Sequence, residues 1–356
     1  MMRKERVCQR SYGRYKASRF LNADIQYNMF RSKIIGTGSY LPEKVVTNFD
    51  LEQMVDTSDE WIRERTGIKE RRIAEDVPVS HLAFGAAERA LKDAMVDPME
   101  IDLIVLGTVT PDMPMPSTAC IVQHKLGAYK AVAFDVAAAC SGFLYALAVG
   151  DQFIRSGMYK KVLVIGADMF SKVVDWTNRD TCILFSDGAG AMLLQATDEH
   201  DEEHVVKSVH LFSDGSQSDK LYIPGGGSLN PASHDTLHEG MHYVRMKGND
   251  LFKLAVKAMV DASHVALEHN GLTVKDVNLV VPHQANIRIM EAIAKKLHLP
   301  MEKVMVTIDY YGNSSAATVP TAFDKARHVG KIQDGDTILA VAFGAGLTWA
   351  STLIKW

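Results

Sequence analysis

A cysteine in a run of small residues is the first candidate for chemistry in this sequence. Residues 133–143 read Ala-Phe-Asp-Val-Ala-Ala-Ala-Cys-Ser-Gly-Phe, and Cys140 begins a helical pattern that continues to Gly150. A thiol at a helix N-terminus lies at the positive end of the helix macrodipole, which favours the thiolate. The small neighbours leave room for an acyl group. The segment indicates a nucleophilic thiol, and a buried structural cysteine is the alternative.

Two polar segments in the second half could complete such a site. His283 stands in Val-Pro-His-Gln-Ala-Asn (281–286), directly after an apolar run that is typical of a buried strand. A side chain at the end of a buried strand often faces a functional site and not solvent. A hydrogen-bonded core histidine is, however, the simpler interpretation. Asn313 stands in Gly-Asn-Ser-Ser (312–315), which by itself is an ordinary turn signal. The three segments together are more specific than any one of them.

In these contexts Cys140, His283 and Asn313 resemble the Cys-His-Asn set of the thiolase-like condensing enzymes. More narrowly, the sequence is similar to the β-ketoacyl-acyl-carrier-protein synthase III family, whose members start bacterial fatty-acid synthesis. The resemblance extends from Lys33 to Trp356. It also includes Gly-Thr-Gly-Ser-Tyr-Leu-Pro (36–42), Asp-Glu-Trp-Ile (59–62), Arg-Thr-Gly-Ile (65–68) and Phe-Gly-Ala-Gly-Leu-Thr-Trp (343–349).

The resemblance implies a role for each of these side chains. Cys140 would take an acyl primer from acyl-coenzyme A. Decarboxylation of a malonyl thioester places negative charge on the thioester oxygen, and His283 and Asn313 would stabilise that enolate as neutral donors. The backbone N–H groups of Cys140 and Ala345 would form the acyl oxyanion hole. The family often has glycine at the latter position, so Ala345 fits there only with a negative φ.

Coenzyme A and carrier-protein positions also follow from the resemblance. Trp61 and Arg179 match residues that sandwich the adenine, which suits a planar base between a π-face and a guanidinium. The other matched coenzyme A positions are Thr57, Arg65, Gly248 and Asn249. The matched carrier-protein docking segment is Gln284, Ala285, Asn286, Ile287 and Arg288. Arg288 with Lys253 and Lys257 would form a basic patch for an acidic carrier protein, although charges on a helix face are more simply solvated.

The primer pocket involves a second copy of the chain in this family. Met115 matches a residue that crosses the dimer interface into the partner's acyl pocket and helps to set primer size. Members with Phe there favour the shortest primers, whereas Met is flexible. We therefore expect a homodimer and an acetyl or somewhat bulkier, branched primer, with coenzyme A thioester as substrate and no cofactor.

Two other functions remain as alternatives at this point, and a third is disfavoured. A related Cys-His-Asn enzyme could act on secondary-metabolite starters or on a biotin-precursor diacid. A degradative thiolase is disfavoured, because that family has a second catalytic cysteine late in the chain and no cysteine follows Cys182. A non-catalytic carrier-protein-binding subunit would typically lose the nucleophile, which this sequence keeps.

The elements that must position these residues repeat along the chain. Residues 82–95 form a helical pattern that leads through a turn to an apolar strand at 101–106, and residues 250–269 lead likewise to a strand at 277–281. Strands that are apolar without alternation predict a sheet covered on both faces. A Gly-Ala-Gly occurs late in each half, at 188–190 and 344–346, and residues 337–354 read as strand, glycine turn, strand.

Two such repeats predict an α/β fold with stacked layers, two-fold pseudo-symmetry and a site where the halves meet. With the resemblance, this becomes a thiolase-like duplicated α/β/α/β/α fold. We expect an N-terminal half at 29–200, containing the cysteine, and a C-terminal half at 201–356, containing His283 and Asn313. The acidic stretch 198–203 would connect them. Residues 1–28 are basic, and we interpret them as a disordered tail or the product of an upstream start codon, with a transit peptide as the alternative.

Composition excludes several classes of protein. The 356 residues are 47% hydrophobic and 23% charged, with a net charge of −4, which is typical of a globular protein and not of a nucleic-acid-binding one. The four cysteines form no Cys-x-x-Cys pair and have no metal-ligand spacing with histidines, so we expect reduced thiols and no metal. No segment favours secretion or a membrane span, and we expect a cytoplasmic protein.

Overall fold

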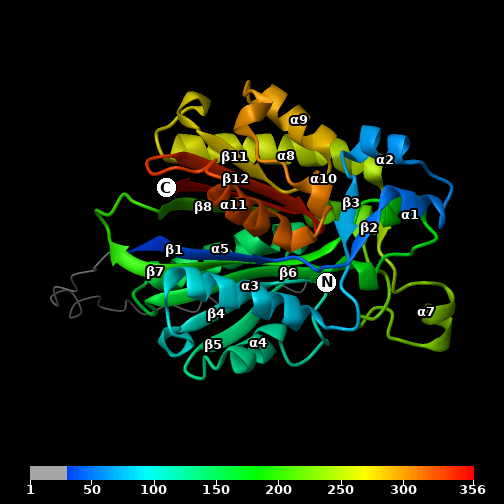
Figure 1. Cartoon of the computed structure of the whole chain (residues 1–356), viewed down its shortest axis with the longest axis horizontal. Coiled ribbons are helices and arrows are strands. Elements are labelled where there is room, and N and C mark those ends of the chain that lie inside the picture. The colour runs from blue at the N-terminus through cyan, green and yellow to red at the C-terminus, as the bar shows by residue number, and fades with distance from the viewer. Residues whose placement is uncertain (1–29) are drawn as a thin grey trace, which may run out of the picture.

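The computed structural model describes residues 30–356, so the expected extension at 1–28 lies outside the described residues (Figure 1). The strands are β1 (Phe30–Tyr40), β2 (Val45–Thr47), β3 (Glu70–Arg72), β4 (Leu103–Gly107), β5 (Val132–Val136), β6 (Lys161–Met169), β7 (Asp187–Asp198), β8 (Val205–Ser213), β9 (Leu221–Tyr222), β10 (Arg245–Met246), β11 (Leu279–Pro282), β12 (Thr337–Gly344) and β13 (Thr348–Lys355). The α-helices are α1 (Asn48–Glu52), α2 (Asp59–Thr66), α3 (Val79–Ala94), α4 (Thr118–Leu126), α5 (Gly142–Arg155), α6 (Arg179–Cys182), α7 (His234–His238), α8 (Gly248–His269), α9 (Ile287–Lys296), α10 (Ile308–Tyr311) and α11 (Thr318–His328). Short 3₁₀ helices are η1 (Pro98–Glu100), η2 (Ala139–Ser141), η3 (Phe170–Lys172), η4 (Gly215–Lys220), η5 (Val274–Asp276), η6 (Met301–Lys303) and η7 (Ser315–Ala317).

The main sheet shows the internal duplication directly. Its nine strands run in the order β11-β12-β13-β8-β1-β7-β6-β4-β5. From the centre outward, β1, β7, β6 and β4 have the same relative directions as β8, β13, β12 and β11, with two antiparallel pairings followed by a parallel one. The β1 and β8 strands meet at the single pair Lys33 and Val205. The predicted two pseudo-symmetric halves are therefore present.

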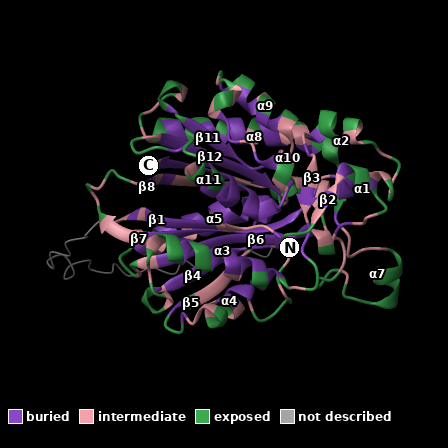
Figure 2. Ribbon diagram, viewed as in Figure 1, coloured by how far each residue is buried: buried purple, intermediate pink, exposed green. Residues whose placement is uncertain are grey.

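The two groups of strands enclose a central helical layer. In Figure 1, α5 and α11 lie between the strands of the two halves, with α8 and α9 outside one half and α3 and α4 outside the other. Both central helices contact strands of both halves. They are buried on nearly all sides (Figure 2), whereas α3 and α8 each bury one face. This is the expected five-layer α/β/α/β/α arrangement.

The repeated patterns fall on equivalent elements. The helical patterns at 82–95 and 250–269 form α3 and α8, and the apolar runs after them form β4 and β11. The predicted strand, glycine turn and strand at 337–354 are β12 and β13, with Gly344 to Gly346 between them. The other Gly-Ala-Gly, at 188–190, lies inside β7, and the acidic stretch 198–203 connects β7 to β8.

Glycines in neighbouring strands allow helical turns to approach the sheet closely. Gly107 on β4 and Gly166 on β6 are paired in register. A Cβ at Gly107 would lie 2.5 Å from the carbonyl oxygen of Gly142, at the start of α5. A Cβ at Gly166 would lie 2.5 Å from the carbonyl oxygen of Ala316, in η7. Only glycine at these two strand positions leaves room for the backbone of the two turns.

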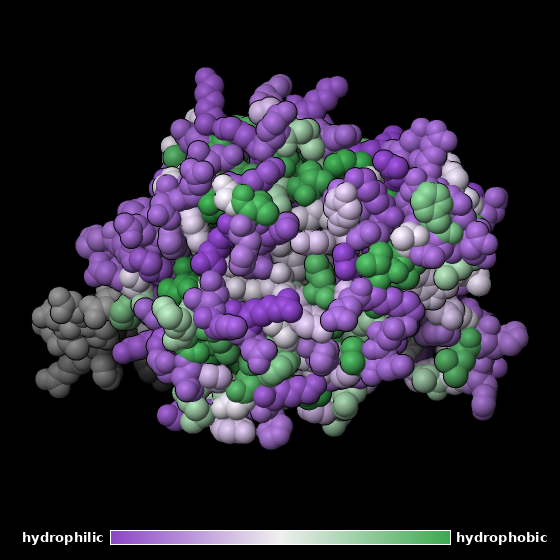
Figure 3. Space-filling model, viewed as in Figure 1, coloured by the Kyte–Doolittle hydropathy of each residue, from purple (hydrophilic) through white to green (hydrophobic). Residues whose placement is uncertain are grey.

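The surface hydropathy and the state of the cysteines are those of an ordinary globular protein. On the face shown in Figure 3, hydrophilic side chains predominate and hydrophobic ones lie in separate small patches. Among the described residues, none of the helices combines the length and apolar character that crossing a bilayer requires. Cys120, Cys140 and Cys182 are free thiols, as predicted, and Cys8 lies outside the described residues.

The glycine at position 166 gives a test of this packing. We expect Gly166→Ala to lower the free energy of unfolding by about 1–3 kcal/mol, because the added methyl group meets backbone that cannot move alone. Urea unfolding measures the change. Gly215→Ala is the matched control, since a Cβ there would contact nothing within 4 Å. Equal stability of the two variants would contradict the role of Gly166.

Candidate active site

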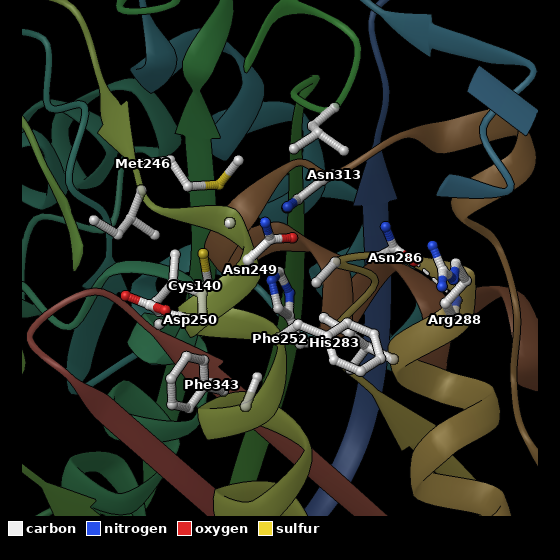
Figure 4. Close-up of a pocket in the computed structure, with 18 of the residues that line it drawn as sticks. Cys140, Met246, Asn249, Asp250, Phe252, His283, Asn286, Arg288, Asn313 and Phe343 are labelled. Atoms are coloured by element: carbon white, nitrogen blue, oxygen red, sulfur yellow. Dashed lines mark hydrogen bonds between the residues drawn. The ribbon is translucent and has the colours of Figure 1, made fainter. Parts of the chain in front are cut away.

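Cys140, His283 and Asn313 line one cavity of about 650 Å³ (Figure 4). Cys140 comes from the turn before α5, His283 follows β11, and Asn313 precedes η7. The two halves of the fold therefore contribute to one site, at the place where they meet. Sequence separation between these residues is large, but the pseudo-symmetry brings the η2 and η7 turns into contact.

The Cys140 turn is held in an unusual backbone conformation. β5 ends at Val136, and η2 then runs directly into α5. Ala139 has a φ of 46°, which is uncommon for a residue with a side chain and costs of order 1–3 kcal/mol. The N–H groups of the first helical turn have no acceptor within the helix. The N–H groups of Ser141 and Gly142 donate to the carbonyl oxygens of Ala138 and Ala139, so the turn presents the thiol and the N–H of Cys140 to the cavity.

Burial of the Cys140 thiol acts against the expected effect of the helix terminus in the ligand-free protein. Only 4% of Cys140 is exposed, and burial raises the pKa of its thiol to about 12. The nearby negative charge of Asp168 acts in the same direction. Desolvation disfavours the thiolate, because an isolated anion in an apolar site loses its hydration. Burial and the helix terminus therefore act on this thiol in opposite directions.

His283 is neutral, as the proposed chemistry requires. Its backbone N–H donates to the carbonyl oxygen of Val341 over 2.7 Å, which fixes the residue at the end of β11. Burial lowers the pKa of the imidazole to about 3. His283 is 2% exposed, and among residues 30–356 no counter-ion offsets the desolvation of its ring.

The tautomer of His283 depends on the hydroxyl group of Thr318. The Thr318 Oγ1 atom lies 2.6 Å from His283 Nδ1 and 2.9 Å from the carbonyl oxygen of Ser315. A hydroxyl has one proton. When Thr318 donates to Ser315, it accepts from Nδ1–H and leaves Nε2 as an acceptor. When it donates to Nδ1, the ring carries its proton on Nε2 and becomes a donor at that atom.

Asn313 is fixed by its backbone and by its own side-chain oxygen. Its N–H donates to Leu184 over 3.1 Å, and its carbonyl oxygen accepts from Ser186 over 2.9 Å. Its Oδ1 atom accepts from the N–H of Ser315 over 3.0 Å. The amide nitrogen is then left to point into the cavity, as Figure 4 shows. Gly312, with a φ of 64°, allows the tight approach of this turn to Ser186.

Most of the other predicted ligand positions border the same cavity. The residues that line it include Arg65, Gly248, Asn249, Ala285, Asn286 and Arg288. Lys253 also lines it, whereas Lys257 pairs with Asp261 at 2.5 Å. Asn286 caps α9 and donates to the carbonyl oxygen of Arg65 over 2.8 Å. Ile287 and Arg288 border an adjoining depression next to α2.

Gln284 is a correction to the predicted docking segment. Its side chain is fully buried, and its amide nitrogen donates to the carbonyl oxygens of Pro282 and Met305. Its Oε1 atom accepts from the N–H of Thr307 over 2.8 Å. The amide group is thus used inside the protein, so Gln284 has no surface to offer to a carrier protein.

The predicted adenine sandwich is closed in this structure. The Arg179 guanidinium carbon lies 4.8 Å from the Trp61 ring centre, and Arg179 also donates to the carbonyl oxygen of Asp56 over 2.7 Å. Arg65 stacks on the same ring at 4.4 Å. A base can enter between Trp61 and Arg179 only if these side chains separate. Nearby, the Thr57 hydroxyl is buried and has no partner among the described residues.

Two further predicted positions are Ala345, in the expected oxyanion hole, and Met115, in the expected primer pocket. Ala345 is not among the described residues with positive φ, which meets the condition stated for it. Its neighbour Gly344 approaches the Cys140 turn so closely that a Cβ there would lie 2.7 Å from the Cys140 nitrogen. Met115 is 82% exposed and does not line the cavity of its own chain.

Three polar residues at the site had no role in the sequence reasoning. Thr318 contacts His283, Ser315 contacts Cys140, and Asp168 lies buried behind them. The signal for Asp168 was present: in β6 this carboxylate directly follows the uncharged run 162–167. Thr318 and Ser315 had no such signal, because hydroxyl side chains are common after a turn. In residues 30–356, no cluster of His, Cys, Asp or Glu side chains has the makings of a metal site.

Comparisons with known proteins agree on one family. The model of 3-oxoacyl-[acyl-carrier-protein] synthase III matches residues 134–215, and that of its C-terminal region matches residues 267–356. The β-ketoacyl-[acyl-carrier-protein] synthase III of Caldanaerobacter subterraneus subsp. tengcongensis is 54% identical over 324 residues, covering 91% of this chain and 97% of that one. The 3-oxoacyl-[acyl-carrier-protein] synthase III of Aquifex aeolicus has a TM-score of 0.84 at 48% identity, covering 91% and 100%. The priming β-ketosynthase of the R1128 polyketide pathway has a TM-score of 0.85 at 35% identity, covering 94% and 99%.

The buried neutral His283 predicts an acid-sensitive contribution to stability. Its pKa is about 3 in the folded protein and near 6.5 when unfolded, so between these values only the unfolded chain takes up the proton. Stability is therefore lost as the pH falls through this window. From pH 7 to pH 5 this residue should cost about 2 kcal/mol. Urea unfolding of wild type and His283→Gln at both pH values tests this, since the variant should lose about 2 kcal/mol less; equal losses would contradict it.

Proposed function

The chain belongs to the β-ketoacyl-[acyl-carrier-protein] synthase III family of condensing acyltransferases, which initiate fatty-acid synthesis, and from this we propose the role of each site residue. An acyl primer passes from acyl-coenzyme A to Cys140, and coenzyme A leaves. Malonyl-acyl-carrier-protein then loses CO₂ and attacks the acyl group, giving a 3-oxoacyl-acyl-carrier-protein. The observation that carries this proposal is the meeting of Cys140, His283 and Asn313 in one cavity.

Cys140 is the nucleophile, and two backbone N–H groups form its oxyanion hole. The close approach of Gly344 to the Cys140 nitrogen supports pairing the N–H of Cys140 with that of Ala345. Such pre-organised donors stabilise the charge that develops on the thioester oxygen. A negative φ at Ala345 is compatible with this role.

His283 and Asn313 stabilise the enolate that forms when the malonyl group loses CO₂. The neutral imidazole can donate from Nε2 once Thr318 donates to Nδ1. The Asn313 amide nitrogen is free to donate because its Oδ1 atom is already bound to the Ser315 N–H. Two neutral donors lower the energy of the enolate without forming an ion pair that would trap it.

Coenzyme A enters beside α2. Trp61 and Arg179 hold the adenine after Arg179 moves off the ring, and Arg65, Gly248 and Asn249 border the path to Cys140. Thr57 supports this path, because its buried hydroxyl has no partner in the described chain. A ligand that supplies one would remove the cost of an unsatisfied polar group.

An acidic carrier protein docks at the cavity mouth. Arg65, Lys253 and Arg288 line the cavity, and within residues 30–356 none of them takes part in an ion pair. Unpaired cations attract an acidic partner and speed its approach. Ala285, Asn286 and Ile287 provide neighbouring contacts, whereas Gln284 is excluded by its burial.

The active unit is a homodimer, and we place it in the cytoplasm. Met115 is exposed on its own chain, which suits a residue that completes the primer pocket of a partner. β5 is an edge strand of the main sheet, with half-buried side chains that a second copy would cover. Sedimentation equilibrium tests this, and a fully active monomer would contradict it.

Primer choice separates fatty-acid initiation from a related function. The similarity to a priming β-ketosynthase of a polyketide pathway favours a secondary-metabolite starter as the second candidate. Both functions use the same chemistry at Cys140. Mass spectrometry of the protein after incubation with acetyl-, branched and longer acyl-coenzyme A identifies the primer and the acylated peptide.

Replacement of Cys140 tests the nucleophile. We expect Cys140→Ala and Cys140→Ser to lose acyl transfer and condensation, because no other thiol lines the cavity in the described chain. Cys120→Ser and Cys182→Ser are the controls and should keep both activities. An acyl adduct trapped on Cys120 or Cys182 in the wild-type protein would overturn the assignment.

Replacement of Asn313 tests the division of roles. We expect Asn313→Ala to slow CO₂ release and condensation by about 10²–10³-fold, because one pre-organised donor is lost, while acylation of Cys140 largely persists. Release of CO₂ from malonyl-carrier protein and transfer of a labelled acyl group are measured separately. Equal loss of both steps, or unchanged CO₂ release, would show that the roles are assigned incorrectly.

A further inference from the structure

Ser315 is a fully buried residue for which the mechanism above has no use. It begins η7, directly after the turn that carries Asn313, and none of its surface is exposed. Its N–H, its carbonyl oxygen and its hydroxyl each have a hydrogen-bond partner. Each of these partners is a residue of the Cys-His-Asn set or a residue that touches one. Ser315 therefore connects the three side chains of the site.

The backbone of Ser315 supports Asn313 and His283. Its N–H donates to Asn313 Oδ1 over 3.0 Å, and the amide nitrogen of Asn313 is directed into the cavity (Figure 4). Its carbonyl oxygen accepts from Thr318 Oγ1 over 2.9 Å, and the same Oγ1 atom lies 2.6 Å from His283 Nδ1. Both supports use backbone atoms of Ser315, so a change of its side chain leaves them available.

The side chain of Ser315 is directed to the nucleophile. Its hydroxyl donates to Cys140 Sγ over 3.5 Å, and hydrogen bonds to sulfur are long because sulfur is a large atom. A neutral thiol is a weak acceptor, whereas hydrogen bonds to a charged acceptor are stronger. The hydroxyl therefore stabilises the thiolate of Cys140 more than it stabilises the thiol.

The backbone on both sides of this contact has a conformation that residues with side chains rarely adopt. Ser315 has a φ of 53° and Ala139, the neighbour of Cys140, has a φ of 46°. Glycine would adopt the conformation at position 315 without strain, but it has no hydroxyl group. Strain of this kind persists at functional sites, where the surrounding structure holds it in place. A use for the hydroxyl accounts for a strained serine at this position.

The thiolate of Cys140 needs stabilisation, because its surroundings oppose it. Cys140 is 4% exposed, and burial raises the pKa of its thiol. The negative charge of Asp168 on β6 acts in the same direction, and the other titratable group at the cavity, His283, is neutral. The hydrogen bonds from the Ser315 hydroxyl and from the Cys140 N–H oppose these effects. Ser315 is thus the side chain that favours the charged sulfur.

We propose that Ser315 is a further catalytic residue, whose hydroxyl donates to the Cys140 sulfur and stabilises the attacking thiolate, a proposal that rests on the proposed function of this cysteine. The sulfur forms a bond to the acyl carbon, and the bond from that carbon to the coenzyme A sulfur breaks. Cys140 gives up one proton and the departing coenzyme A thiolate takes up one. Ser315 keeps its own proton throughout, because it acts as a hydrogen-bond donor and not as a base.

Alkylation by iodoacetamide tests this hydrogen bond without any substrate of the enzyme. The thiolate is the reacting form, so the rate at a given pH reports the thiolate fraction of Cys140. Mass spectrometry follows the Cys140 peptide over a range of pH values. We expect Ser315→Ala to slow its alkylation by about 10–100-fold at each pH below the pKa of the thiol, as loss of a hydrogen bond to a charged group does. An unchanged rate overturns the proposal.

Two further variants separate the hydrogen bond from packing. Ser314 is also buried, and its hydroxyl has no partner in the described chain, so Ser314→Ala should be alkylated at the wild-type rate. Ser315→Gly removes the same hydroxyl and fits the φ of 53°, so it should react as slowly as Ser315→Ala. Both changes at position 315 widen access to the sulfur, so a slower reaction is not steric. Equal slowing in Ser314→Ala, or the wild-type rate in Ser315→Gly, overturns the proposal.

The two half-reactions distinguish an effect on the sulfur from a displaced turn. We expect Ser315→Ala to slow single-turnover acylation of Cys140 by acetyl-coenzyme A by about 10–100-fold, while CO₂ release from malonyl-carrier protein largely persists. The reason is that the backbone supports of Asn313 and His283 remain. This pattern is the reverse of that expected for Asn313→Ala. Equal slowing of both steps would mean that the turn has moved, which overturns the proposal.

Failure of this proposal differs from failure of the proposed function. A wild-type protein that forms an acyl adduct on Cys140 but is alkylated no faster than Ser315→Ala overturns the role of Ser315 alone. A wild-type protein that forms no adduct with acetyl-, branched or longer acyl-coenzyme A overturns the proposed function, and the catalytic role of Ser315 with it. Ser315→Gly decides the question if Ser315→Ala does not fold.

Discussion

The contact between two symmetric turns is the constraint on which the rest of this structure depends. η2 carries Cys140 and η7 follows Asn313, and both turns lie against strands whose glycines leave no room for a side chain. Each turn begins a helix of the central layer, so the strands of both halves fix its position. Because packed interiors resist small displacements, this contact sets the sulfur and the amide group in place before any substrate binds.

The same contact buries the site, and burial determines its electrostatics. It lowers the pKa of the His283 imidazole to about 3 and raises the pKa of the Cys140 thiol. In the proposed reaction, the first shift keeps His283 a neutral donor and the second opposes the thiolate form of Cys140. The nearby negative charge of Asp168 also raises the pKa of the Cys140 thiol.

The cavity mouth differs from the buried interior in its charge and exposure. Its cations are exposed and free of ion pairs among the described residues, and Arg65 and Arg179 lie against the nearby Trp61 ring. Electrostatic attraction at such a surface acts on the approach of a partner more than on its final affinity. The fold therefore combines a buried interior with a charged, exposed entrance.

The sequence by itself was enough for the layered α/β fold and its duplication, and it singled out three residues that the structure brings into one cavity. These features have local signals: repeated helix–strand patterns, a small-residue run before Cys140, and a histidine directly after a buried strand.

Only the tertiary structure decided which groups surround these residues. The raised pKa of Cys140, the burial of Gln284 and the closed stacking of Arg179 on Trp61 all depend on neighbours far away in the sequence. The N–H of Ala316 donates to Asp168 across 148 residues of chain, and no local sequence pattern predicts such a contact. Desolvation and hydrogen bonding are properties of the packed environment, whereas sequence patterns report the element in which a residue lies.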